Sequence, residues 1–175
     1  MPLSDNMDVF VEQIVKKKKD FTDYLIITAA CFLALVILFG IFIYLFFFLP
    51  LAAVGLGYGL YYLINSRHVE FEYSVTNGDI DIDRIVGKKK RQRIVSVSGS
   101  KIEAFGRLTG DFDAGKFDRR VMAAPSPFEE GLLYFSYRSK KRGNTLVIFM
   151  PGDRIVKALN EGLRRDLRMT VQENM

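Results

Sequence analysis

The stretch VEFEYSVTNGDIDIDR, residues 69–84, decides the fold of the larger part of this chain. Apolar and polar residues alternate on both sides of Asn77 and Gly78, which is the period of a β-strand with one buried face. An Asn-Gly pair is preferred in two-residue type I′ turns. Such a turn places Tyr73 opposite Ile82, so the apolar residues of both strands meet on one face. We therefore predict a β-hairpin.

The opposite face of this hairpin is acidic. Alternation on a solvated strand face explains the carboxylates without catalytic or metal chemistry, and we expect them to be exposed. They are Glu70, Glu72, Asp79, Asp81 and Asp83.

Further strands and one helix are predicted downstream. Residues 98–130 are rich in Gly, Pro and Asp and indicate no clear element. After Pro151, apolar residues recur at helical spacing through Leu167. We therefore expect residues 67–175 to form a mostly β domain, a small barrel or sandwich with a C-terminal amphipathic helix. The predicted strands are Arg91–Val97, Leu132–Arg138 and Thr145–Phe149, the last two joined by a Lys140–Asn144 turn.

Upstream of the hairpin, residues 25–65 contain no charge. As one helix these 41 residues would extend about 60 Å, twice a hydrocarbon core of about 30 Å. Two spans joined by a tight reversal use the length, so we predict a transmembrane hairpin within residues 23–66. Its spans are Tyr24–Tyr44 and Leu49–Ile64, with the turn around Phe46–Pro50.

Cations flank both spans, and the connecting turn has none. Lys16, Lys17, Lys18 and Lys19 precede the first span, and Arg67 follows the second. The positive-inside rule then predicts a multi-pass protein of the cell membrane with both termini in the cytoplasm.

The segment 1–22 is expected to be cytosolic or interfacial. Its apolar residues fit a short amphipathic helix lying in the membrane interface, with an unstructured tail as the alternative. They are Met7, Phe10, Val11, Ile14 and Val15.

Small residues in the second span indicate close helix packing. Gly55 and Gly59 form a small-xxx-small pattern that fits packing within the hairpin or, alternatively, association with another copy.

A cluster of cations follows the hairpin of residues 69–84. Strand two returns toward the membrane, so the loop at residues 87–90 is expected near anionic headgroups, where each cation contributes about 1 kcal/mol. A topology signal, a solvated loop or an acidic partner protein remain alternatives, whereas the absence of interleaved aromatics argues against nucleic acid. The cluster holds six cations in ten positions and no acid: Arg84, Lys88, Lys89, Lys90, Arg91 and Arg93.

Catalytic and metal chemistry have little support. Cys31 and His68 are each the single residue of their type, so no disulfide and no Cys/His metal site is predicted. No serine lies in a nucleophile-elbow motif. We expect no enzyme and no cofactor.

The pattern resembles an uncharacterised family of small membrane proteins of Gram-positive bacteria. The resemblance rests on residues 69–84, the Lys/Arg-rich third strand and the segment GNTLVIF at residues 143–149 followed by Pro151. More loosely, strands followed by a C-terminal helix are similar to the bacterial pleckstrin-homology (PH-like) domain, which implies binding of lipids or proteins without catalysis.

Two functions follow from this reading. The first is a membrane-anchored, non-catalytic binding module at the cytoplasmic leaflet, which contacts anionic lipid headgroups or a membrane or cytosolic protein partner. The second is a structural or accessory subunit of a larger membrane complex.

Overall fold

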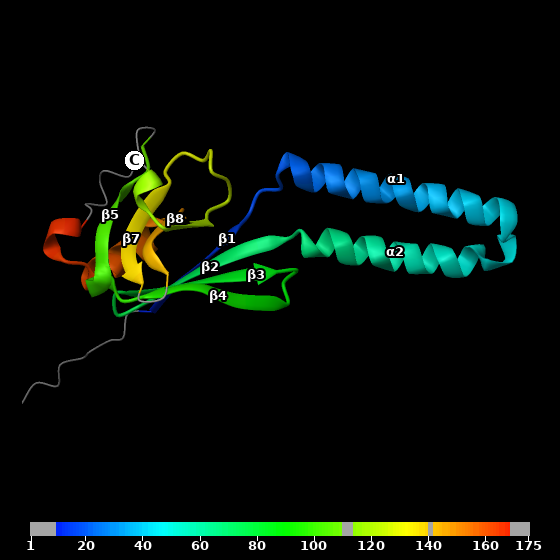
Figure 1. Ribbon diagram of the computed structural model, residues 1–175. Helices are drawn as coiled ribbons and strands as arrows, with labels where there is room; N and C mark the ends of the chain where they lie inside the picture. Colours follow the sequence, from blue (N-terminus) through cyan, green and yellow to red (C-terminus); the bar gives the residue numbers. More distant parts are fainter. Residues whose placement is uncertain (1–9, 110–113, 140–141, 169–175) are drawn as a thin grey trace, which may run out of the picture. The chain divides into compact units, whose positions relative to one another are not determined.

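The computed structural model describes residues 10–109, 114–139 and 142–168. It contains an apolar helical hairpin and a β domain of two four-stranded sheets with one C-terminal α-helix (Figure 1). The chain separates into two compact units: residues 18–69 with 86–90, and the remainder, which holds most of both sheets.

The apolar hairpin consists of α1 (Phe21–Tyr44), the short 3-10 helix η1 (Phe46–Phe48) and α2 (Leu49–Ser66). Pro50 occupies the first turn of α2, where its missing N–H is not needed. Both helices are long and apolar enough to cross a membrane, and little of either is buried. The predicted helical hairpin and its turn are confirmed.

The first sheet has the order β1-β2-β3-β4, with β1 (Phe10–Lys16), β2 (Val69–Thr76), β3 (Asp79–Val86) and β4 (Lys90–Val97). Asn77 and Gly78 both have positive φ, as a type I′ turn requires. The predicted hairpin of β2 and β3 is confirmed, and the third strand begins one residue earlier than expected.

Strand β1 corrects the sequence analysis, which predicted an amphipathic helix over this segment. Residues 10–16 pair antiparallel with β2, from Phe10 opposite Thr76 to Lys16 opposite Glu70. The helix prediction was wrong because Val11 and Val15 also suit a strand, and pairing with β2 decides between them. Met7 lies outside the described residues.

The second sheet has the order β5-β7-β8-β6, with β5 (Ile102–Arg107), β6 (Arg119–Ala123), β7 (Leu133–Ser139) and β8 (Gly143–Phe149). The sequence predicted β7 and β8 to within two residues. It did not predict β5 or the short strand β6, which runs parallel to β8. Residues 140–141 of the predicted turn lie outside the described residues.

Aromatic side chains from both sheets form the core of the β domain. The ring of Phe149 contacts those of Tyr73 and Phe135, with centroids 5.6 and 5.2 Å apart and nearly perpendicular planes. All three side chains are fully buried. The two sheets do not close into a barrel.

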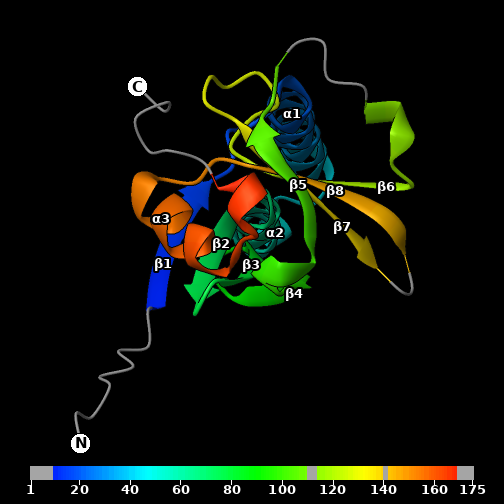
Figure 2. The ribbon, with the colours of Figure 1, turned by 90° about the vertical axis from the view of Figure 1, so that its left-hand side faces the viewer.

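The C-terminal helix α3 (Asp153–Gly162) lies beside β1 and covers one end of the β domain (Figure 2). It buries Ile155, Val156 and Leu159. The helix ends earlier than the sequence predicted, and Leu167 lies in the short 3-10 helix η4 (Arg165–Leu167).

Candidate functional site

The turn between β3 and β4 lies against the end of α2. The Gly87 amide donates to the His68 carbonyl oxygen at 2.8 Å, and Asn65 Nδ2 lies 3.4 Å from the Gly87 carbonyl oxygen as a donor. Gly87 and Lys88 both have positive φ, which gives a tight two-residue turn. These contacts hold Lys88, Lys89 and Lys90 next to the last residues of α2.

The same end of the hairpin carries the start of α1. Asp23 in the first turn of α1 pairs with Arg67, which follows α2, at 3.6 Å. The charges that precede α1 and those of the β3–β4 turn therefore gather at one end, which we call the basic end. It comprises Lys18, Lys19, Arg67, Lys88, Lys89 and Lys90.

Lys88 and Lys89 of the turn and Lys90, the first residue of β4, are exposed. Within the described part of the chain, none of them has an ion-pair partner, and Arg84 has none either. The opposite end of the hairpin, at η1, is formed by Phe46, Phe47 and Phe48 and carries no charge. The positive charge of the hairpin therefore lies at the basic end, and the end at η1 is apolar.

Arg91 and Arg93 of the predicted cation cluster have a different environment. They lie on β4 and pair with carboxylates of β2 and β3. Arg93 Nε lies 3.0 Å from Asp83 Oδ1, and Arg93 Nη1 lies 3.0 Å from Asp81 Oδ2. Arg91 binds Glu72 and approaches Asp83 at 4.0 Å. The carboxylates neutralise much of the charge of both arginines, so only part of the predicted cluster remains without counter-charge.

The acidic face of the β2–β3 hairpin is accordingly not uniformly solvated, and that expectation was wrong for two residues. Glu72 is 5% exposed and Asp83 is 6% exposed. Alternation identifies the strand face on which a carboxylate lies, but it does not show that other side chains cover this face. We call Glu72, Asp81, Asp83, Arg91 and Arg93 the acid–arginine cluster.

Burial raises the pKa of Glu72, because loss of water disfavours its charged form more than Arg91 favours it. The neighbouring carboxylates of Glu12 and Asp83 add to the rise. The pKa of Arg93 is also raised, because its hydrogen bond to Asp83 and the negative charge of Asp81 favour the charged form of the guanidinium.

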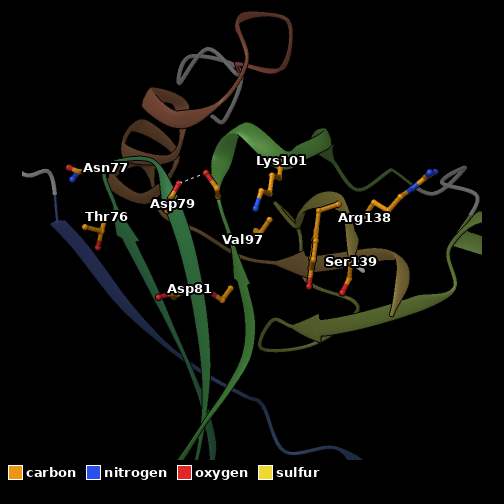
Figure 3. A pocket seen from close by; sticks show the side chains of 11 residues that line it. Thr76, Asn77, Asp79, Asp81, Val97, Lys101, Arg138 and Ser139 are labelled. Carbon is orange, nitrogen blue, oxygen red and sulfur yellow. Dashed lines mark hydrogen bonds between the residues drawn. The ribbon is translucent and has the colours of Figure 1, made fainter. Parts of the chain in front are cut away.

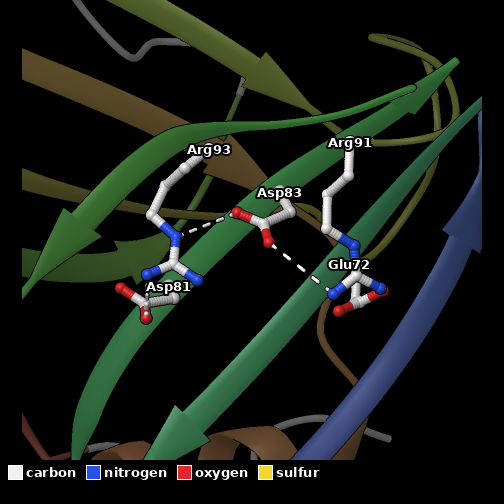
Figure 4. Close-up of polar contacts among 5 residues, drawn as sticks. All are labelled: Glu72, Asp81, Asp83, Arg91 and Arg93. Carbon is white, nitrogen blue, oxygen red and sulfur yellow. Dashed lines mark hydrogen bonds and ion pairs between the residues drawn. The ribbon is translucent and has the colours of Figure 1, made fainter.

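A groove that the sequence did not predict runs between β4 and β7 (Figure 3). Its larger part has a volume of about 700 Å³ and is lined by polar side chains of both strands and of the β2–β3 turn. A second part of about 340 Å³ shares Ser96, Tyr137 and Ser139 with the first. No motif marks this groove, because it arises from two strands that are distant in sequence. The acid–arginine cluster lies on β2, β3 and β4 (Figure 4), and two of its members, Asp81 and Arg93, line the groove.

The glycines of α2 have no close neighbours. Gly55 and Gly59 are exposed, and a methyl group at either would meet no atom within 4 Å. In the middle of α2 the half-buried positions are instead spaced by four, at Ala52, Leu56 and Leu60, and further half-buried residues lie near its two ends, at Leu49 and at 63–66. A close helix approach at the two glycines is therefore not part of the contact between α1 and α2.

Two sheets followed by one C-terminal helix are consistent with a PH-like domain, here with no closed barrel and with an apolar helical hairpin between the first two strands. The profile of the family described as bacterial PH-like domain (DUF6106) matches residues 7–169, and the chain belongs to this family. The match includes the hairpin and β1, and it confirms the resemblance drawn from the sequence. A search of the curated proteins and a search of the solved structures give no match. PH-like domains are generally non-catalytic binding modules.

Proposed function

We propose that this protein is a membrane-anchored, non-catalytic binding module whose basic end contacts anionic lipid headgroups at the cytoplasmic leaflet. The observation that carries the proposal is the contact of Gly87 with Asn65 and His68. Because this contact fixes Lys88–Lys90 at the end of an apolar helix, a membrane that accepts α2 brings its headgroups to these lysines.

The polarity of the hairpin supports the same orientation. Cations gather at the basic end, whereas η1 is aromatic and uncharged. The positive-inside rule then keeps the basic end, both termini and the β domain in the cytoplasm. The low burial of α1 and α2 supports membrane insertion, since a water-soluble chain would cover such apolar helices.

The test measures lipid binding to the whole chain in neutral detergent micelles. Soluble short-chain phosphatidylglycerol should bind more tightly than short-chain phosphatidylcholine, and added salt should weaken the difference. Changing Lys88, Lys89 and Lys90 to Gln removes about 3 kcal/mol at about 1 kcal/mol per cation, which corresponds to roughly a 100-fold weaker affinity.

The matched control changes three exposed cations of the C-terminal segment, Arg154, Lys157 and Arg165, to Gln. This control should retain affinity for phosphatidylglycerol. Equal losses in both variants would show that net charge alone acts, and unchanged binding in the Lys88–Lys90 variant would reject the headgroup contact.

The exposed glycines favour a second candidate, an accessory subunit of a membrane complex. Gly55 and Gly59 leave space beside α2 into which a helix of another protein fits closely. Replacing both glycines with Leu should release such a subunit from detergent-purified complexes while leaving phosphatidylglycerol binding unchanged.

A further inference from the structure

The groove between the two sheets follows the edge of a strand. Successive side chains of a strand point to opposite faces, so a cavity over one face is lined by every second residue. Here all residues from Arg93 to Ser98 line one or both parts of the groove. The groove therefore runs along the backbone edge of β4, which is the last strand of its sheet.

The wall of the groove opposite β4 also contains part of a strand edge, at the end of β7. The pairing of β7 with β5 ends at Tyr137, which lies opposite Ile102. Arg138 and Ser139 extend beyond this pair, and both line the groove. On that side of β7, these two residues have no neighbouring strand among the described residues.

The acidic and the basic side chains of the groove differ in whether they have a partner. Asp79 accepts hydrogen bonds from Ser98 Oγ at 2.7 Å and from the Gly99 amide at 3.3 Å, and Asp81 pairs with Arg93. In contrast, Lys101, Arg138 and Arg142 line the groove without an ion-pair partner in the described part of the chain. The groove thus presents satisfied acids and unpaired cations.

We propose that the groove binds an extended, acidic segment of a partner protein, which adds a strand to the edge of β4 and places carboxylates on Arg138 and Arg142. Backbone hydrogen bonds to β4 supply affinity in this mode of recognition, and flanking side chains supply selectivity. The proposal rests on the proposed function as a binding module, but it uses a surface different from the basic end.

The test places the whole chain in nanodiscs of neutral phosphatidylcholine and measures the fluorescence anisotropy of a labelled peptide of alternating Val and Glu. This peptide should bind, and the corresponding Val and Lys peptide should not. The variant Arg138→Glu with Arg142→Glu should bind the acidic peptide at least 10-fold more weakly. The matched control, Arg154→Glu with Lys157→Glu on α3, should bind it like the wild type.

Two further measurements separate strand addition from simple charge attraction. An acidic peptide with N-methyl groups on alternate amides should lose binding, because it cannot form the backbone hydrogen bonds. Binding of the unmodified acidic peptide to the wild-type protein should also slow amide hydrogen exchange in residues 94–98. Absence of binding, equal binding of the N-methylated peptide, or equal losses in the control variant would each overturn the proposal. The variant with Lys88, Lys89 and Lys90 changed to Gln should retain peptide binding. A failure of the proposed headgroup contact can therefore be distinguished from a failure of the proposed peptide binding.

Discussion

At the residue scale, a single hydroxyl links three strands of the β domain. The hydroxyl of Tyr73 on β2 donates to the carbonyl oxygen of Ala123 at the end of β6. It also accepts from the Met150 amide, which follows β8, at 3.3 Å. Tyr73 is fully buried, and burial raises its pKa to about 12. One side chain therefore satisfies two backbone groups inside the core.

Replacing Tyr73 with Phe keeps the ring but leaves both backbone groups without their partner. We expect the free energy of unfolding to fall by about 1–3 kcal/mol, measured by chemical unfolding of the whole chain in neutral detergent and followed by near-ultraviolet circular dichroism. The exposed Tyr58→Phe is the control and should be silent.

The raised pKa of Tyr73 also predicts the behaviour of the wild type in alkali. The folded state holds the phenol proton more tightly than the unfolded state, so stability is lost as the pH rises from about 10 through about 12. Tyr73→Phe should lack this part of the alkaline loss. An identical loss of stability with rising pH in the wild type and in Tyr73→Phe would contradict the raised pKa of Tyr73.

The buried carboxyl of Glu72 makes a second pH-dependent prediction. Since its pKa is raised in the folded state, its contribution to stability is present below its unfolded-state pKa and is lost as the pH rises through the folded-state value. Glu72→Gln should therefore gain stability relative to the wild type between pH 4 and pH 7, as seen in unfolding curves across this range.

Arg91→Ala provides the complementary measurement, because it leaves the Glu72 charge without its partner. We expect a loss of about 1–3 kcal/mol at pH 7 and a smaller loss at pH 4, where Glu72 is protonated. Combining it with Glu72→Gln should recover much of this loss. A double variant as unstable as Arg91→Ala would mean that Arg91 acts mainly through packing.

At the scale of elements, three glycines fix α3 on the β domain. Gly78 of the β2–β3 turn, Gly99 after β4 and Gly162 at the end of α3 contact one another through backbone atoms. A Cβ at Gly162 would meet the carbonyl oxygen of Gly78, with the Gly78 Cα only 2.7 Å away. Helix propensity favours alanine over glycine by up to about 1 kcal/mol, so the two effects oppose each other.

We expect the steric effect to win in Gly162→Ala, because backbone neighbours cannot rotate away. The free energy of unfolding should fall by about 1–3 kcal/mol, the usual cost of overpacking. Gly59→Ala, where the methyl group meets nothing within 4 Å, serves as the control. A Gly162→Ala variant of unchanged stability would show that the backbone around Gly78 and Gly99 shifts at little energetic cost.

The elements also show what sequence alone can and cannot predict. Strands β2 and β3 were predictable because their alternation and the Asn77-Gly78 turn agree on one register. Strand β1 was not, since residues 10–16 suit either period and only the partner strand decides. For the candidate site, the lysines of residues 88–90 were visible as a charge run. The contact of the neighbouring Gly87 with Asn65 and the pairing of Arg91 with Glu72 depend on tertiary structure and were not predictable.

At the scale of the whole molecule, the proposed topology predicts where the two termini lie. Reporter fusions after the whole chain and before residue 1 should both report the cytoplasm, because the positive flanks of both helices resist translocation. Reversing the charge of the flank by changing Lys16, Lys17, Lys18 and Lys19 to Glu should disturb this orientation. The same charge change at four exposed cations of the C-terminal segment, Arg154, Lys157, Arg164 and Arg165, should not. An external signal from either unmodified terminus would contradict the hairpin topology.

The position of the hairpin between β1 and β2 has a consequence for biosynthesis. Strand β1 leaves the ribosome first, yet residues 17–68 must follow before its partner β2 exists. The two strands then come together only when both apolar helices have been synthesised and have turned back, because closing so long a connection carries an entropic cost that the paired hairpin reduces. Under the proposed topology, completion of the first sheet reports that both helices have entered the bilayer. A nascent chain with one helix misplaced would keep β1 and β2 apart and expose the unpaired edge of β2 to the quality-control proteases of the cell.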